Sequence, residues 1–285
     1  MRFLIAESEP PEDRQRRRDT VGRSAGETYI DTLRELAPDA DCDRVTPADA
    51  DTVVPDIAAL AEYDAVFLTG SPLHLYEDTP EVRREIAFMR AVFASGTPSF
   101  GSCAGLQIAT VAAGGTVRKM RGRHEAGFAR RITPTEAGRD HPLLRGRPAA
   151  FDAPSIHGDE VERLPDGATL LASNAVTEVQ AAEIRCGNGV FWGVQYHPEL
   201  PFGEITAALR RQADDPIEHG LAKSKADVEA VAVKVEALAD EALRDAAAWQ
   251  LGLDGEVVED GKRRVEIANF IEHLVRPTRV KRGRG

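Results

Sequence analysis

The sequence predicts an α/β protein whose open, mostly parallel sheet is flanked by helices. Over roughly the first 115 residues, short apolar runs that favour strands alternate with amphipathic runs that favour helices. Such alternation is typical of strand–helix–strand units, in which successive strands pair in parallel. Beyond this region the pattern changes to short β-rich segments, which predict an antiparallel extension of the sheet. A helical C-terminal appendage is expected after the extension.

The elements of the first half follow from local patterns. From Gly26 to Pro38, apolar residues recur every three or four positions, which predicts a helix. The stretch 7–22 is charged and has no apolar periodicity, so we expect a loop there. Strands are expected at 2–6, 42–45, 64–68 and 98–101, and further helices at 82–93 and 106–113.

The second half begins with β-rich segments and ends in helices. Between Val228 and Trp249 apolar residues step by three and four, which predicts one long amphipathic helix. A shorter helix is expected at 265–275, before a basic tail. We therefore divide the chain into an α/β domain at 1–205 and a helical extension at 206–285. The β-rich segments are 116–120, 128–133, 168–173, 178–186 and 190–195.

Composition and charge exclude several classes of protein. Of the 285 residues, 42% are hydrophobic and 29% charged, as in ordinary globular proteins. The net charge of -11 argues against nucleic-acid binding, because phosphate-backbone binders usually carry a basic face. The basic clusters at 14–18 and 276–284 are interpreted as a solvated loop and a frayed end.

No membrane, metal or cofactor is expected. The apolar runs are much shorter than the roughly 20 residues that cross a bilayer. The N-terminus lacks the pattern of a signal peptide, so we expect a cytoplasmic location. Cys42, Cys103 and Cys186 have no CxxC spacing and are too few for a disulfide framework or a thiolate zinc site.

Cys103 has the setting of a catalytic nucleophile. It lies in Gly101-Ser102-Cys103-Ala104-Gly105, between a predicted strand and a predicted helix. Small neighbours allow a sharp turn that presents one side chain at the carboxyl end of the sheet. The N-terminus of a helix also favours a thiolate. The alternative, a buried inert cysteine, is weakened by the flanking glycines.

His197 and Glu199 have the spacing of a base and the carboxylate that orients it. In an extended segment, residues two apart point to the same side, so the imidazole and the carboxylate can face each other. Pro198 between them favours that extended form. A surface turn without a role is the alternative, but the pair follows an apolar strand, where ligands of α/β sheets bind.

Cys103, His197 and Glu199 together predict a catalytic triad. The base activates the thiol, and the carboxylate holds the imidazole and stabilises its cation. An oxyanion hole is then needed. The backbone N–H of Ala104 follows the nucleophile, and the turn at Gly70 and Ser71 ends a preceding strand, so we expect the donors there.

Three motifs in this order resemble the class I glutamine amidotransferase family, especially its stand-alone branch similar to the glutaminase of GMP synthase. They are LTGSP at 68–72, GSCAGLQ at 101–107 and GVQYHPE at 193–199. The resemblance covers roughly residues 1–205 and implies a flavodoxin-like catalytic domain. It also implies that the thiol hydrolyses the side-chain amide of glutamine through a glutamyl thioester.

The resemblance also implies substrate-binding residues. Gln107 matches a glutamine that helps to hold the substrate, although it could instead be a polar residue that caps a pocket. Ser155, Ile156 and His157 lie in a segment similar to the one whose backbone holds the α-amino acid end. For His157 a structural hydrogen bond is the alternative.

The sequence is compatible with more than one function for this site. No ATP-pyrophosphatase domain follows, so we expect any ammonia acceptor to be a separate synthetase subunit. The extension also resembles that of plant γ-glutamyl peptidases, so a γ-glutamyl peptide or amide hydrolase without ammonia transfer is an alternative. A non-catalytic binding module is a second alternative. The partner is expected to be glutamine or another γ-glutamyl small molecule, with selectivity sought in the arginine-rich stretch 8–23.

Overall fold

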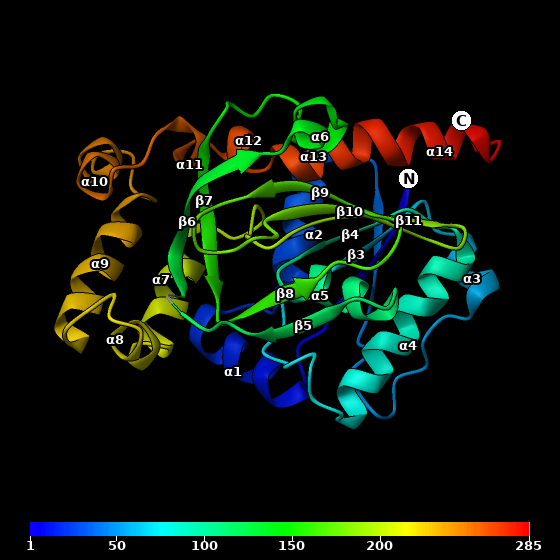
Figure 1. Ribbon diagram of the computed structural model, residues 1–285, viewed down its shortest axis with the longest axis horizontal. Coiled ribbons are helices and arrows are strands. Elements are labelled where there is room, and N and C mark those ends of the chain that lie inside the picture. Colours follow the sequence, from blue (N-terminus) through cyan, green and yellow to red (C-terminus); the bar gives the residue numbers. More distant parts are fainter. Residues whose placement is uncertain (123, 285) are drawn as a thin grey trace.

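A nine-stranded sheet forms the centre of the computed structural model, which describes residues 1–122 and 124–284 (Figure 1). The strand order is β2-β1-β3-β4-β11-β10-β9-β6-β7. Strands β2 to β11 in this order are parallel, and the rest of the sheet is antiparallel. The predicted α/β class is confirmed. The strands are β1 Arg2–Ala6, β2 Asp41–Val45, β3 Ala65–Leu68, β4 Ser99–Ser102, β5 Thr116–Lys119, β6 Glu125–Pro134, β7 Phe151–His157, β8 Asp159–Arg163, β9 Ala168–Ser173, β10 Ala181–Cys186 and β11 Gly189–Val194.

Helices cover both faces of the parallel part of the sheet, which explains why all residues of β3 and β4, and all but the first of β1, are buried. On one face, Phe67 and Phe100 pack against Phe270 of α13, with ring centroids 5.4 and 5.5 Å apart. On the other face, Leu4 and Val66 share a core with α4 and α5. The helices are α1 Pro11–Val21, α2 Ala25–Leu36, α3 Ile57–Ala61, α4 Pro80–Ser95, α5 Ala104–Ala112, α6 Glu136–Asp140, α7 Phe202–Arg211, α8 Asp214–Glu218, α9 Lys225–Ala237, α10 Arg244–Leu251, α11 Gly255–Val258, α12 Asp260–Arg263, α13 Val265–Phe270 and α14 Arg276–Lys281, with a 3-10 turn η1 Pro142–Leu144 and a π-helical turn η2 Ile271–Val275.

The loop expected at 7–22 is wrong, because Pro11–Val21 forms the helix α1. No residue of α1 is buried, which explains why the segment shows no apolar periodicity. The helix is instead specified by its ends. Proline at the first position, acidic residues in the first turn and a left-handed Gly22 after the last turn are all favourable there.

The single long helix expected between Val228 and Trp249 is also wrong. The segment forms two helices, α9 and α10, joined by a turn. In that turn Asp240 accepts a hydrogen bond from the backbone N–H of Ala242, a local bond that competes with helix. Figure 1 shows α8, α9 and α10 gathered beside α7 and the strands β6 and β7.

The basic tail is not a frayed end. Residues 276–281 form α14, and the guanidinium of Arg282 donates to the carbonyl oxygens of Gly96 and Tyr63. The turn η2 before α14 contributes Ile271 and Val275 to the same core as Phe100. The division of the chain after residue 205 stays a prediction.

The β-rich middle of the chain differs in detail from the expectation. Strands β7 and β8 were not predicted, and β10 begins at Ala181 rather than at residue 178. β7 completes the sheet by pairing with β6. None of the helices in the described ranges combines the length and the apolar character that a membrane crossing requires.

Candidate active site

Cys103 occupies a strained turn between β4 and α5. Its backbone has φ 53° and ψ -110°, and a positive φ is rare for a residue with a side chain. Two glycines make the turn fit: a Cβ on Gly105 would lie 2.7 Å from the carbonyl oxygen of Leu68, and one on Gly101 would lie 2.9 Å from Gly105. A hydrogen bond of 2.8 Å from the Cys103 N–H to the Val194 carbonyl fixes the turn.

His197 and Glu199 face each other as the sequence predicts. The Nδ1 atom of His197 lies 2.8 Å from Oε1 of Glu199. The other carboxylate oxygen accepts a bond of 2.9 Å from the Ser102 hydroxyl, which in turn lies 2.6 Å from the hydroxyl of Tyr29. The His197 backbone N–H donates to Pro154 on β7. The His197 backbone and the Glu199 carboxylate are therefore held in place by β4, β7 and α2.

The electrostatics of His197 favour a charged imidazole. Burial alone would lower its pKa, but the negative charge of Glu199 and the hydrogen bond with Cys103 raise the pKa of His197 to about 10. An imidazolium that is hydrogen-bonded to the thiol stabilises the thiolate, the form that acts as a nucleophile. The arrangement can therefore attack a carbonyl carbon and supply a proton to a leaving group.

The predicted oxyanion-hole residues surround this pair. A Cβ on Gly70 would lie 2.9 Å from Cε1 of His197, so the imidazole ring packs directly on the Gly70 backbone. The Ser71 hydroxyl donates to the Ser8 carbonyl at 2.7 Å, so only the backbone of Ser71 is left to face a substrate. Ala104 begins α5 directly after Cys103. Their role as donors stays a prediction.

A cavity of about 290 Å³ opens onto Cys103 and His197. Gly70, Ser71 and Ile156 also line it, as expected from the sequence. The remaining lining residues come from the turn after β3, from α1 and the segment before it, and from α7 and the residues on either side of it: Glu9, Asp13, Arg16, Arg17, Pro72, Leu200, Ala208, Arg211 and Gln212.

The other predicted substrate residues lie behind this lining. The amide of Gln107 donates to the Asp159 carbonyl at 3.0 Å and is almost fully buried. His157 is held between the Asp159 carbonyl and the buried carboxylate of Glu125, with 2.9 Å to each. Ser155 lies 3.4 Å from the same carboxylate. Contact of a substrate with Gln107 and with the backbone of the 155–157 segment stays a prediction.

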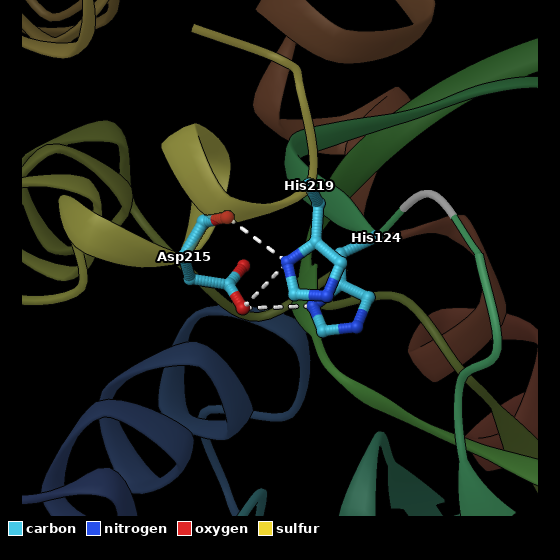
Figure 2. Close-up of side chains that lie close together, drawn as sticks. All are labelled: His124, Asp215 and His219. Atoms are coloured by element: carbon cyan, nitrogen blue, oxygen red, sulfur yellow. Dashed lines mark hydrogen bonds and ion pairs between the residues drawn. The ribbon is translucent and has the colours of Figure 1, made fainter. Parts of the chain in front are cut away.

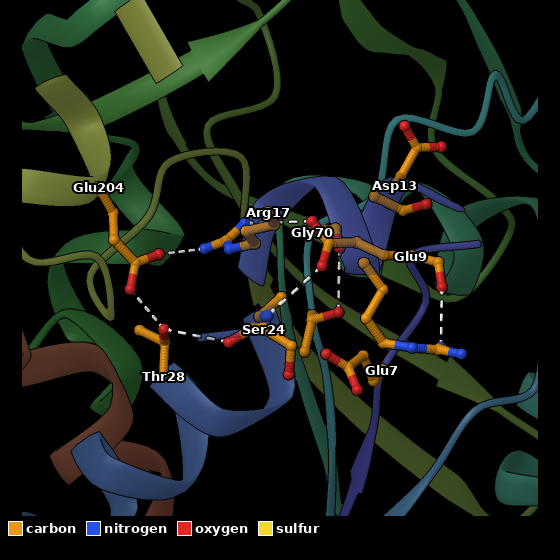
Figure 3. A network of polar contacts seen from close by, with 12 residues as sticks. Glu7, Glu9, Asp13, Arg17, Ser24, Thr28, Gly70 and Glu204 are labelled. Atoms are coloured by element: carbon orange, nitrogen blue, oxygen red, sulfur yellow. Dashed lines mark hydrogen bonds and ion pairs between the residues drawn. The ribbon is translucent and has the colours of Figure 1, made fainter. Parts of the chain in front are cut away.

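The arginine-rich stretch 8–23, in which selectivity is sought, does line the cavity, but sequence reasoning missed that this stretch forms the helix α1. Figure 3 shows Arg17 of α1 beside Glu9 and Glu204, with Gly70 nearby. Arg17 pairs with Glu9 at 3.2 Å and also with Glu204 at the start of α7. Thr28 of α2 bonds to the same Glu204. The helix signals in 11–22 could have located α1. The position of α1 beside the cavity, however, depends on ion pairs between residues far apart in the sequence.

A second cluster of titratable groups lies outside the catalytic cavity (Figure 2). Nδ1 of His124 is 2.8 Å from Oδ1 of Asp215, and the ring of His219 stacks on that of His124 with centroids 3.4 Å apart. In the part of the chain that the structure describes, these three residues form the group that could hold a cation, with donor atoms within 4.8 Å. Hydrogen bonds within the cluster already account for its geometry.

The chain matches the family model described as "Glutamine amidotransferase class-I" over residues 21–213. A Pseudomonas protein named gamma-glutamyl-L-1-hydroxyisopropylamide hydrolase is 36% identical over 98% of this chain and 94% of its own length. The GMP synthase of Wolinella succinogenes is 35% identical over 50% of this chain, but the match spans 26% of that enzyme.

Solved structures share the fold. A glutamine amidotransferase of Thermotoga maritima has a TM-score of 0.64 at 18% identity, covering 96% of this chain and 98% of that one. A protein of Thermoplasma acidophilum described as a putative subunit of GMP synthase has a TM-score of 0.53 at 20% identity, covering 75% and 97%. The chain therefore belongs to the class I glutamine amidotransferase family and is an amide hydrolase of that family's type.

Proposed function

We propose that the chain hydrolyses a γ-glutamyl amide, with Cys103 as nucleophile, His197 as acid and base, and Glu199 as the residue that orients the imidazole. One observation carries the proposal: the strained turn at Cys103 opens into the same cavity as His197, whose Nδ1 lies 2.8 Å from Glu199. This is the order of nucleophile, base and orienting carboxylate that acyl transfer requires.

In the first half of the reaction the Cys103 thiolate attacks the amide carbonyl carbon. The carbonyl oxygen becomes an oxyanion, which the backbone N–H groups of Ala104 and Gly70 would bind. The imidazolium of His197 gives its proton to the amide nitrogen as the C–N bond breaks. Ammonia or an amine leaves, and the glutamyl group remains on sulfur as a thioester.

In the second half a water molecule replaces the amine. His197, now neutral, takes a proton from this water as its oxygen attacks the thioester carbonyl. The C–S bond breaks and the thiolate of Cys103 leaves, again stabilised by the imidazolium. Glutamate is released, and the resting charges of Cys103 and His197 are restored.

The amide of a small amine is our preferred substrate. The Pseudomonas relative named for a γ-glutamyl hydroxyisopropylamide spans nearly the whole chain, the segment beyond residue 205 included. That full-length similarity supports a hydrolase that needs no acceptor subunit. The apolar part of the cavity lining, Pro72, Ile156, Leu200 and Ala208, suits a short alkyl group.

Hydrolysis of glutamine for a separate synthetase is the second candidate. It is supported by the similarity to GMP synthases, although their match stops at about half of this chain. On this hypothesis, ammonia produced at Cys103 would pass to an acceptor on another chain.

Glutamate release from three compounds tests the proposal. Glutamine, γ-glutamylisopropylamide and γ-glutamylglycine would each be incubated with the wild-type protein and with Cys103→Ala, and the products measured by mass spectrometry. We expect release by the wild-type protein alone, fastest from the isopropylamide. A higher rate on glutamine would favour the second candidate. No thiol-dependent release from any of the three would contradict the proposal.

A further inference from the structure

The catalytic cavity has a charged wall that the proposed chemistry does not use. The segment that leads into α1, α1 itself and the last turn of α7 supply five charged residues to the lining. The scissile amide of a γ-glutamyl compound is neutral, so the reaction at the thiol needs none of these charges. The five are Glu9, Asp13, Arg16, Arg17 and Arg211.

Four of these five charges neutralise one another. Arg17 pairs with Glu9, and also with Glu204 just outside the lining. Arg16 pairs with Asp13 at 2.6 Å. In contrast, Arg211 has no carboxylate within 4.0 Å among the residues that the structure describes. The cavity therefore contains one guanidinium that forms no ion pair with the described residues.

The surroundings of Arg211 favour an anionic ligand over a neutral or cationic one. Partial burial and the positive charges of Arg17 and Arg16 lower the pKa of Arg211, and they outweigh the opposite effect of the Glu9 and Asp13 carboxylates. A carboxylate entering the cavity would relieve the repulsion. A guanidinium presents parallel N–H donors that match the two oxygens of a carboxylate.

We propose that Arg211 forms the carboxylate-binding subsite of the catalytic cavity and selects amides that carry a free carboxylate away from the scissile bond. The inference rests on the proposed function of Cys103. The carboxylate has two chemical sources, the α-carboxylate of the glutamyl group or a carboxylate on the leaving amine. Both share the same chemistry, and substrates that carry one or the other distinguish them.

The test compares Arg211→Gln with a matched control, Arg210→Gln. Arg210 is the neighbouring arginine of α7, but it pairs with Glu229 and Glu236 on the protein surface and does not line the cavity. Because Arg211 is exposed and forms no ion pair, its replacement should leave the fold intact, which circular dichroism checks.

Two substrates isolate the α-carboxylate. γ-Glutamylethylamide carries it, and N-ethyl-4-aminobutanamide is the same molecule without it. We expect Arg211→Gln to lower kcat/KM on the first compound by about 10- to 100-fold, mostly through KM, as for loss of a charged hydrogen bond. The kcat/KM on the second compound should be unchanged by the substitution. Arg211→Lys should recover part of the loss on the first compound. Arg210→Gln should match the wild-type protein on both.

A third substrate identifies the other source. γ-Glutamylglycine adds a carboxylate to the leaving amine, so a loss confined to this compound would assign Arg211 to the leaving group. Calorimetric binding of the same compounds to Cys103→Ala, with and without Arg211→Gln, reports the subsite without turnover. Equal kcat/KM values for Arg211→Gln and the wild-type protein on all compounds would overturn the inference, as would equal affinities by calorimetry. A wild-type protein that binds these compounds through Arg211 but hydrolyses none would contradict the proposed function alone.

Discussion

The imidazole ring of His197 lies directly on the backbone of Gly70, so close that a Cβ at Gly70 would be 2.9 Å from Cε1 of the ring. The turn after β3 and the segment after β11 therefore fit together only with glycine at this position. The same turn is expected to supply an oxyanion donor. The proposed base and the proposed oxyanion donor therefore share one contact.

Gly70→Ala should damage catalysis without unfolding the protein. The added methyl group must displace the His197 ring, and displacement of a catalytic group by about 1 Å can cost about 100-fold in rate. We expect a fall of this size in kcat with little change in thermal melting temperature. Gly203→Ala is the control, because a Cβ there meets nothing within 4 Å. Normal kcat in Gly70→Ala would contradict this account of the base.

Glu199→Gln should lower the pKa of His197 from about 10, because the negative charge that holds the proton is lost. The folded-state pKa lies above the ordinary 6.5, so the charged imidazole stabilises the fold fully below about pH 6.5, and this contribution disappears as the pH rises through about 10. NMR titration of the His197 Cε1–H signal measures the change. Glu199→Gln should also lose less activity than Cys103→Ala. An unchanged titration would contradict the role given to Glu199.

Ser102→Ala should lower kcat, but by less than Glu199→Gln does. The Ser102 hydroxyl donates a hydrogen bond of 2.9 Å to Glu199 and also contacts the hydroxyl of Tyr29. Loss of one buried hydrogen bond typically costs about 1 kcal/mol. We expect roughly a fivefold lower kcat and a modest shift of the His197 titration. A loss as large as that of Glu199→Gln would mean that Ser102 acts on the substrate itself.

The sequence alone was sufficient for the α/β class and for grouping the candidate triad, because both depend on local signals. Glycines around Cys103 predict the turn, and the spacing of His197 and Glu199 predicts that they face each other. The helix α1 was missed because it has no buried face, so the pattern that reveals most helices is absent. Its helix-end signals were present but carried no information about where the helix lies.

The pairing of the charges in the cavity wall could not be predicted for a different reason. Arg17 and Glu204 are 187 residues apart in the sequence, and no local pattern links them. Arg211 is one of two neighbouring arginines on α7, and only the packing of that helix decides which of them faces the cavity. Strands β7 and β8 were missed because their sequences mix charged residues with apolar ones.

Glu85→Gln should weaken the dependence of the free energy of unfolding on pH between about pH 4.5 and pH 8. Burial raises the pKa of Glu85 from 4.5 to about 8, and its carboxyl group accepts a bond from Ser8 beneath the Ser71 turn. The folded protein holds this proton while the unfolded chain has lost it, so wild-type stability falls as pH rises from about 4.5 to about 8. Each pKa unit is worth about 1.4 kcal/mol, so the fall should amount to several kcal/mol.

Chemical denaturation at a series of pH values measures this effect. The amide of Glu85→Gln cannot ionise, so its stability should change less than that of the wild-type protein between pH 5 and pH 8, and it should be the more stable of the two at the upper end. Parallel curves for the two proteins would show that Glu85 is ionised at neutral pH.

Arg147→Met should destabilise the whole fold. Arg147 is bonded to Glu266 at 2.7 Å and Glu266 also accepts from Tyr196, next to His197, with all three side chains buried. Removing one partner of a buried ion pair typically costs about 3–5 kcal/mol, because the other charge is left uncompensated. Urea denaturation measures the loss. Replacing both Arg147 and Glu266 by Met should restore part of the stability, and a double variant weaker than Arg147→Met would contradict this explanation.

The central claim is that one thiol, Cys103, cleaves a γ-glutamyl amide. The chain provides its own controls, since Cys42 and Cys186 are free and lie away from the cavity lining. The most direct measurement is glutamate release from γ-glutamylisopropylamide and glutamine by the wild-type protein and by Cys103→Ala, Cys42→Ala and Cys186→Ala. The account predicts release by all except Cys103→Ala, whose rate should fall to background. Release by Cys103→Ala at the wild-type rate would contradict it.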